Sequence, residues 1–350
     1  MKSHLRTIQY DGELGRAQGY TQKLCLIVPF FDERRVLPRL LEAIDALAQR
    51  LQARSVLIET ILVDDGSGDD GREAITAWAR DRVPAFDVRV LRLSRNFGKE
   101  LALSAGLEAA DGDAVVLMDA DLQHPVEMVE TFVAAWLDEG YDVVYAHRQD
   151  HRREDIGKRL LRAGFYRLIN ATSDAVLAPH SGDFRLMSRR AYQALLQFPE
   201  RERLMKGLYG LIGFSTKAVP YAPHPRAEGA SKYSPLKLWA MGLNGVTSHS
   251  VFPLRLTLFM GLALGLLALG YGVWTIIEKL VFGIQVPGYP TLIVIISTIG
   301  AGQLIGMGIV GEYIGKVLVE VKRRPLYILE SDERIAAAAA PARQDLSLTA

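Results

Sequence analysis

Several features that other protein classes depend on are scarce in this sequence. The 350 residues include a single cysteine, Cys25, which excludes an intramolecular disulfide and fits a reduced compartment. Lysine and arginine (41) nearly balance aspartate and glutamate (40), so the formal net charge of +1 gives no argument for a nucleic-acid partner. The amino terminus has no apolar core of the kind a signal peptide needs, because Lys2, Arg6, Asp11 and Glu13 interrupt it. Long apolar runs occur only in the last third of the chain.

Short apolar runs alternate with helix-like patterns in the first half of the chain. These runs have the length and β-branched content of buried strands, and they cover residues 24–29, 58–63, 88–93 and 114–118. Strand, polar loop and helix recurring in this order predict an α/β fold, with helices on the faces of an open parallel sheet. A polar cluster follows each strand, and ligands of such sheets bind at the carboxyl ends of the strands. The polar clusters are therefore expected to converge on one site.

Two apolar segments near the end of the chain, 256–277 and 291–310, are each about long enough to cross ~30 Å of hydrocarbon. Positive charge lies outside them, with Arg255 before the first and Lys316 and residues 322–324 after the second. The positive-inside rule then places both termini in the cytoplasm. A buried helical hairpin in a soluble domain is the alternative interpretation.

These patterns divide the chain into segments. We predict a flexible leader at 1–22, an α/β catalytic domain at 23–232, interfacial amphipathic helices at 233–254, a two-helix transmembrane anchor at 255–311, a juxtamembrane cytoplasmic segment at 312–330 and a disordered tail at 331–350. The interfacial prediction rests on Leu236, Trp239 and Met241 mixed with Lys237, a composition that would hold the domain against a bilayer. A structural helix packed on the domain is the alternative.

The tripeptide Asp119-Ala120-Asp121 is the sharpest local signal for chemistry. Its two carboxylates follow a predicted buried strand, and Mg²⁺ and Mn²⁺ prefer such oxygen ligands beside substrate phosphates. A metal there would neutralise charge that develops on a departing nucleoside diphosphate. Taken alone, the tripeptide more often marks an exposed turn, but its place after a strand favours the metal. His124 is either a further ligand or, in the favoured interpretation, a residue at a helix start.

Two other polar clusters have a functional and a structural interpretation. Residues 64–67 end a strand, where a carboxylate can accept hydrogen bonds from a ribose or a base while Gly66 permits a tight turn. Asn96, Gly98 and Lys99 either place an amide and an ammonium near a phosphate or form an ordinary helix entry.

In their order and spacing, these motifs resemble those of the family-2 inverting glycosyltransferases with the GT-A fold. The motifs are Val28–Glu33, Val63–Ser67, Asn96–Lys99 and Asp119–Pro125. Within that family the chain is similar to polyprenyl-phosphate glycosyltransferases, namely dolichyl-phosphate mannose synthases and, more closely, bacterial bactoprenol glucosyltransferases. The second likeness extends through Ser181–Met187, Arg226–Tyr233, Gly311–Lys316 and Lys322–Tyr327, so that the resemblance covers roughly residues 22–330.

The resemblance implies a role for each matching position. It assigns donor binding to Pro29, Asp32 or Glu33, Asp65, Asn96, Lys99 and Gln123, and a mobile loop over the phosphates to Arg226, Ser231 and Lys232. Asp119 and Asp121 would flank the metal and the diphosphate, with Asp121 as the direct ligand. Asp183 is the position compared with a base, and we expect it to orient the acceptor or Arg185 as much as to take a proton. The family usually has asparagine where this chain has Asp32, whose carboxylate cannot donate a hydrogen bond when ionised.

A polyprenyl phosphate acceptor demands cations more than it demands a base, because a phosphate monoester is already an anionic nucleophile near neutral pH. The protein must hold this anion close to the donor diphosphate. The resemblance assigns that task to Arg148, Lys158, Arg159, Arg162 and Arg185. Without the resemblance, the basic stretch is equally well interpreted as a solvated helix face, since acidic residues are interspersed in it.

The resulting hypothesis is an inverting transfer of a hexose to undecaprenyl or another polyprenyl phosphate by a multi-pass protein of the cytoplasmic membrane, with its catalytic domain on the cytoplasmic side. UDP-glucose is the favoured donor, and GDP-mannose or a UDP-aminopentose is the alternative. A polymerising synthase would need a sugar acceptor site and usually more membrane spans. A non-catalytic scaffold would be marked by loss of Asp119 or Asp121, and both are present. A thin two-span anchor makes a homo-oligomer plausible, with a number that the sequence does not define.

Overall fold

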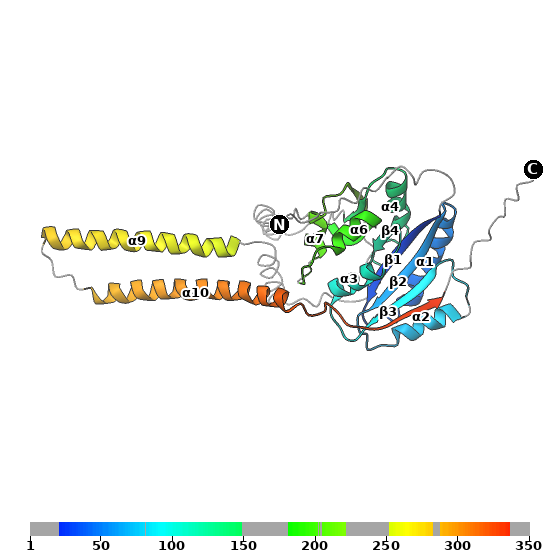
Figure 1. Ribbon diagram of the computed structural model, residues 1–350, viewed down its shortest axis with the longest axis horizontal. Helices are drawn as coiled ribbons and strands as arrows, with labels where there is room; N and C mark the ends of the chain where they lie inside the picture. Colours follow the sequence, from blue (N-terminus) through cyan, green and yellow to red (C-terminus); the bar gives the residue numbers. More distant parts are fainter. Residues whose placement is uncertain are drawn as a thin grey trace, which may run out of the picture.

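The computed structural model describes residues 21–80, 82–148, 181–201, 203, 205–221, 252–282 and 288–336. They form an α/β domain from which a pair of long helices projects (Figure 1). Almost all of the predicted leader (1–22) and of the predicted interfacial segment (233–254) lies outside the described residues.

The α/β domain is built on one eight-stranded sheet with the order β7-β5-β6-β4-β1-β2-β3-β8. The strands are β1 (Gln22–Phe30), β2 (Val56–Asp64), β3 (Asp87–Leu93), β4 (Ala114–Leu117), β5 (Val143–Arg148), β6 (Ser181–Ser188), β7 (Thr216–Tyr221) and β8 (Leu329–Ala336). Neighbours β4, β1, β2 and β3 are parallel, whereas β6 and β8 run antiparallel to β4 and β3. The predicted α/β fold is confirmed, and its parallel sheet becomes a mixed sheet because of β6 and β8.

Helices cover both faces of this sheet. They are α1 (Leu37–Gln52), α2 (Gly71–Arg80), α3 (Lys99–Ala109), α4 (Met128–Leu137), α6 (Arg189–Leu196) and α7 (Met205–Leu211). Successive side chains of a strand point to opposite faces. The even-numbered Leu24, Leu26 and Val28 of β1 therefore pack with α1, α2 and α4, whereas Cys25 and Ile27 pack with α3, α6 and α7.

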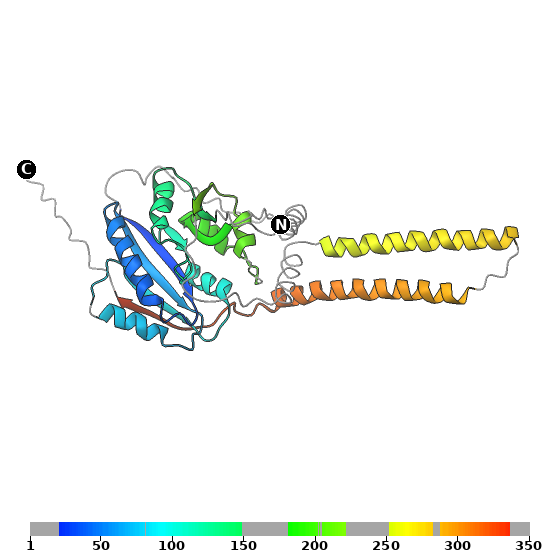
Figure 2. The same ribbon diagram turned by 180° about the vertical axis from the view of Figure 1, so that it is seen from behind.

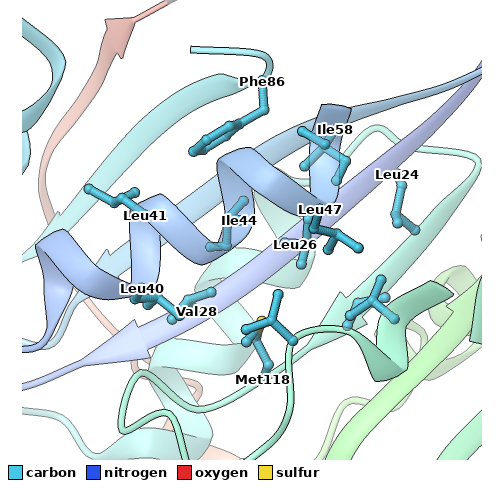
Figure 3. Packing of buried hydrophobic residues seen from close by; sticks show 14 of the residues in the cluster. Leu24, Leu26, Val28, Leu40, Leu41, Ile44, Leu47, Ile58, Phe86 and Met118 are labelled. Carbon is cyan, nitrogen blue, oxygen red and sulfur yellow. The ribbon is translucent and has the colours of Figure 1, made fainter. Parts of the chain in front are cut away.

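The face under α1 shows why this segment is helical. Its buried residues Leu40, Leu41, Ile44 and Leu47 recur at intervals of three and four, which places them on one side of a helix. Figure 3 shows this stripe facing strand residues of the same cluster, among them Leu26 and Val28. Because β1 is buried on both faces, its sequence is a continuous apolar run and not an alternating one.

A segment near the end of the chain, β8, forms one edge of the sheet. The predicted disordered tail at 331–350 is wrong for residues 331–336, which belong to the edge strand β8 and pair with β3. Ion pairs fix this strand: Asp332 binds Arg89 at 2.6 Å and Glu330 binds Arg92 at 3.0 Å. The acidic composition gave no local strand signal, since the partner strand lies more than 200 residues earlier in the chain.

Deletion of residues 329–350 is expected to lower the melting temperature by roughly 5–10 °C, because β3 would become an unpaired edge. Differential scanning fluorimetry of the detergent-solubilised protein measures this. Deletion of residues 337–350 alone is the matched control, since it leaves β8 in place and should keep the wild-type melting temperature. Equal melting temperatures for the two deletions would show that β8 does not support the domain.

The projecting pair consists of α9 (Phe252–Phe282) and α10 (Tyr289–Lys322), which lie side by side in both views (Figures 1 and 2). Their 31 and 34 residues correspond to roughly 46 and 51 Å at the helical rise of ~1.5 Å per residue, more than a bilayer core requires. The two helices approach each other at Gly302 and Gly306, where an added Cβ would lie 3.3 Å from Leu264 and 3.9 Å from Thr257. The apolar windows of both helices are 0% buried, so these residues do not form the buried hairpin of a soluble domain.

Candidate active site

The polar clusters predicted to converge do so at the carboxyl ends of the central strands. Strands β1 and β4 are neighbours, but the chain runs from β1 outward to β3 before it returns to β4. Such a reversal of the strand order is a topological switch point, and ligands of α/β sheets bind in the crevice beside it. The antiparallel β6 begins at the same edge, because its Arg185 pairs with Leu117 near the end of β4. This brings Asp183 to the residues that follow β4.

Lys99 joins three of these segments. As the first residue of α3, it extends its ammonium between Asp119 Oδ1, at 2.6 Å, and Asp183 Oδ2, at 2.7 Å. Burial alone would lower the pKa of Lys99, but the two carboxylates raise it above the ordinary value, so the ammonium stays charged. The predicted donor-phosphate lysine thus lies between the metal-motif aspartate and the acceptor-side aspartate.

Asp119 carries a firm negative charge. Burial on its own would raise the pKa of its carboxyl, but interactions with His124 and with the ammonium of Lys99 lower the pKa to about 2. The His124 ring packs between Phe184 and Tyr221, with centroid distances of 4.8 and 5.4 Å, and its Nε2 is 3.8 Å from Asp119 Oδ2. His124 therefore supports Asp119 from the side and does not begin α4, whose first residue is Met128.

Asp121 is held by the turn that follows it. Its Oδ1 accepts a hydrogen bond of 3.0 Å from the backbone N–H of Gln123, and Leu122 between them has a φ of 55°. This is the arrangement of an Asx turn, which aspartate forms readily. It fixes the direction of the carboxylate without burying it, as a metal ligand requires.

Negative charge accumulates around Glu33. Burial is the main cause that raises the pKa of its carboxyl, and the nearby carboxylates of Asp121, Asp69 and Asp32 raise it further. Several carboxylates close together repel one another, and a divalent cation bound between them relieves this repulsion. The donors present therefore fit Mg²⁺ or Mn²⁺, with Asp121 and Asp119 as the residues that would hold it.

A second group of potential ligands lies at the opposite end of the sheet. Among the described residues, Cys25, Glu59 and Asp111 bring one ligand atom each within 4.8 Å of the others. The ammonium of Lys23 already occupies this position, 2.8 Å from Glu59 and bonded to Asp111. This cluster is a structural ion pair and not part of the active site.

Asp65 holds the loop that carries Asn96. The buried carboxylate accepts hydrogen bonds from the backbone N–H groups of Phe97, at 2.7 Å, and Gly98, at 2.9 Å. The residue predicted to bind the nucleoside thus also ties the end of β2 to the start of α3. Gly66 follows with a φ of 71°, and a Cβ there would lie 2.7 Å from the backbone nitrogen of Asn96. Only glycine fits this position.

Gly66→Ala is expected to destabilise the protein by about 2–4 kcal/mol and to raise KM for the sugar nucleotide, because it strains the backbone and displaces the loop over residues 95–98. Thermal unfolding and donor kinetics measure the two effects. Gly68→Ala is the matched control, since a Cβ at Gly68 would meet only Asp32 Oδ1 at 3.9 Å. Similar behaviour of the two variants would contradict the role given to Gly66.

Asp32 has a clear task despite its departure from the asparagine of the family motif. Its Oδ1 accepts hydrogen bonds from the backbone N–H groups of Gly68, at 2.8 Å, and Asp69, at 3.3 Å, while its own N–H donates to Ser67 Oγ at 3.0 Å. These contacts use the carboxylate as an acceptor only. An aspartate therefore serves here where the motif has an amide.

Arg185, which the resemblance assigns to the acceptor phosphate, is more deeply buried than a residue that contacts a substrate directly would be. It is 4% exposed, its Nη2 donates to Gly182 O at 2.7 Å, and its guanidinium carbon lies 3.3 Å from the ring centre of Tyr209. Burial lowers the pKa of Arg185. Tyr209, a residue of α7, carried no sequence signal, since only the tertiary fold brings it to β6.

The remaining predicted residues are placed in part. Pro29 is buried within β1, Asn96 is exposed on the loop after β3, and Gln123 is half-buried after Asp121. Arg148 is the last residue of β5, and its side chain lies outside the described set. The same holds for all atoms of Lys158, Arg159, Arg162, Arg226, Ser231 and Lys232.

A carboxylate-rich edge of an α/β sheet, followed by an apolar hairpin long enough to span a membrane, is the arrangement expected of a membrane-associated glycosyltransferase with a GT-A-like fold. Residues 25–196 match glycosyl transferase family 2, and residues 252–317 match the GtrB C-terminal hairpin. This chain belongs to glycosyl transferase family 2.

Its similarity to individual proteins extends over nearly the whole chain. The SfII prophage-derived bactoprenol glucosyl transferase of Shigella flexneri is 41% identical over 314 residues, which cover 89% of this chain and 99% of that protein. The uncharacterized glycosyltransferase sll0501 of Synechocystis is 38% identical over 314 residues, which cover 88% and 95%. A structure of glucosyl-3-phosphoglycerate synthase from Mycobacterium tuberculosis aligns with a TM-score of 0.44 and 20% identity, over 65% of this chain and 76% of that one.

Proposed function

We propose that this chain transfers glucose from UDP-glucose to undecaprenyl phosphate or a similar polyprenyl phosphate, with inversion at the anomeric carbon, at the cytoplasmic face of a membrane. The observation that carries the proposal is the ammonium of Lys99, which links Asp119 of the metal motif to Asp183 on the acceptor side. The bactoprenol glucosyl transferase named above, at 41% identity, supports both the sugar and the lipid.

On the donor side, the chain's residues hold the sugar nucleotide and receive its charge. The loop held by Asp65 and the turn held by Asp32 both lie at the carboxyl edge of the sheet, after β2 and β1, where the sugar nucleotide would bind. Asp121 and Asp119 would hold Mg²⁺ or Mn²⁺, which supplies Lewis-acid stabilisation of the leaving diphosphate when bound. Lys99 adds a fixed positive charge at the same edge, where an electrostatic contribution is large.

On the acceptor side, an oxygen lone pair of the lipid phosphate forms the bond to the anomeric carbon as the bond to the UDP oxygen breaks. The electron pair of that bond leaves with UDP, and the opposite faces of attack and departure invert the centre. The phosphate needs no deprotonation by a strong base, so Asp183 orients the acceptor and the cations around it. Its Oδ2 is held by Lys99, while its buried Oδ1 has no hydrogen-bond partner among the described residues.

The apolar hairpin explains how a polar sheet meets a lipid. Helices α9 and α10 would anchor the domain to the bilayer, with Lys316, Lys322 and Arg323 on the cytoplasmic side together with both termini. The polyprenyl tail then stays in the hydrocarbon while its phosphate reaches the site. Both the enzyme and the lipid acceptor then diffuse in the plane of the membrane, so the acceptor reaches the site by diffusion in two dimensions.

The test uses the purified full chain in nanodiscs with undecaprenyl phosphate and Mg²⁺ or Mn²⁺. UDP-glucose, UDP-galactose, UDP-N-acetylglucosamine and GDP-mannose are supplied separately, and lipid extracts are analysed by mass spectrometry. The expected result is a glucosyl phospholipid from UDP-glucose only. Product from GDP-mannose instead would reject the donor, and no product from any donor with folded protein would reject the function.

A further inference from the structure

Arg185 is a buried cation that forms no salt bridge in the described part of the chain, although the carboxylate of Asp183 is near enough to favour its charged form. Its partners among the described residues are the carbonyl of Gly182 at 2.7 Å and the faces of two aromatic rings, Tyr209 at 3.3 Å and Tyr145 at 5.9 Å from the guanidinium carbon. Its Nε has no hydrogen-bond partner among those residues. A buried guanidinium without a salt bridge is costly, and the aromatic faces and the nearby charge of Asp183 compensate only in part. The guanidinium of Arg185 is therefore placed to attract a further anion.

The position of Arg185 on β6 indicates on which side of the site its charge acts. Asp183 and Arg185 are two residues apart on β6, so they lie on the same face of the sheet. That face is covered by α3 and α7, and the α7 residue Met205 donates its backbone N–H to Glu100 of α3 at 3.1 Å. Lys99, the neighbour of Glu100, holds Asp183 Oδ2. The guanidinium thus lies behind the acceptor side of the site and away from the donor loops.

Tyr209 determines where this guanidinium can lie. The residue is 9% exposed, and its neighbours Met205 and Leu208 are anchored in the core beneath α7. Its ring covers the guanidinium, whereas its hydroxyl has no hydrogen-bond partner in the described residues. The ring, and not the hydroxyl, is therefore the part of Tyr209 that contacts Arg185.

We propose that Tyr209 is a positioning residue for the acceptor: its ring clamps Arg185 behind Asp183, and the clamped cation attracts the phosphate of the lipid. This inference rests on the proposed function, because it takes the phosphate of the polyprenyl acceptor as the further anion that Arg185 attracts. Tyr209 touches neither substrate and acts through Arg185. Removal of the ring should therefore change acceptor kinetics and leave donor kinetics unchanged.

The first experiment measures steady-state kinetics of the full chain in nanodiscs with UDP-glucose and undecaprenyl phosphate. Tyr209→Leu is expected to raise KM for the lipid phosphate about tenfold, with KM for UDP-glucose within about twofold of wild type. Tyr209→Phe, which keeps the ring, should retain wild-type constants. Should the leucine variant not fold, Tyr209→Met removes the ring while retaining an adaptable apolar side chain, with the same kinetic expectation.

A double-mutant cycle tests whether Tyr209 acts through Arg185. If it does, Arg185→Lys combined with Tyr209→Leu loses no more activity than Arg185→Lys alone. Losses that simply add would overturn the proposal. A fall in melting temperature with unchanged lipid KM in Tyr209→Leu would also overturn it.

Tyr192→Leu is the matched control for a lost buried tyrosine. Tyr192 is 2% exposed and donates to Gly112 O at 3.0 Å, at the end of the sheet away from the site. Its replacement should lower the melting temperature and leave both KM values unchanged. Wild-type protein that forms no glycolipid would reject the proposed function and this inference with it, whereas active wild type with a normal Tyr209→Leu variant would reject only the inference.

Discussion

Asp121→Asn is expected to lower kcat by about 10³-fold with little change in stability, because the amide removes the charge that holds a divalent cation at the diphosphate. The Asx turn through Gln123 N–H survives, since an amide oxygen still accepts that hydrogen bond. Initial rates of glucolipid formation measure the effect. EDTA added to wild-type protein should cause a loss of similar size, and added Mg²⁺ or Mn²⁺ should reverse it.

The matched control for this variant is Asp111→Asn. Asp111 is an exposed aspartate that pairs with Lys23 at the opposite end of the sheet. Its replacement should leave kcat at the wild-type value. Wild-type activity in Asp121→Asn, or insensitivity of the wild type to EDTA, would contradict the metal-dependent mechanism.

Lys99→Gln is the second change with a large expected effect, a fall in kcat of about 10²-fold. The amide removes the positive charge between Asp119 and Asp183, so their carboxylates repel each other and the approaching phosphates lose a fixed cation. Lost packing contributes little to the fall in kcat, because the Lys99 side chain is 41% exposed. Rates at saturating donor and acceptor separate this effect from weaker binding.

Lys217→Gln is the control for loss of a lysine ion pair. Lys217 binds Glu139 at 2.5 Å on the edge strand β7, where it takes no part in the site. Activity of this variant should equal that of the wild type. If Lys99→Gln were as active as Lys217→Gln, the bridge between the two aspartates would be a structural ion pair without a role in transfer.

The fold was predictable wherever local pattern and tertiary packing agree. The apolar runs of β1 to β4 and the stripe of α1 are the hydrophobic core itself, so their sequence directly reflects their burial. The pairing of β8 with β3 was not predictable, since this charged segment becomes a strand by pairing with a distant strand whose arginines neutralise its carboxylates. The continuation of α10 through Lys322 likewise exceeds the apolar span that the sequence delimits.

The site was predictable in its residues and not in their contacts. Motif spacing indicated Asp65, Lys99, Asp119 and Asp121, but the sequence could not show that Lys99 would bridge two carboxylates or that Asp65 would tie down a loop. Those contacts depend on the switch point between β1 and β4 and on the antiparallel entry of β6. Tyr209 was missed for the same reason, since nothing near it in sequence marks it.

The most direct test of the central claim compares two lipid acceptors that differ only in the phosphate. Purified protein in nanodiscs receives radiolabelled UDP-glucose and Mg²⁺ with either undecaprenyl phosphate or undecaprenol. The account predicts label in the lipid phase with the phosphate alone, as one glucose for each lipid. Equal transfer to undecaprenol, or label released only as free glucose in water, would contradict the claim that the lipid phosphate is the nucleophile.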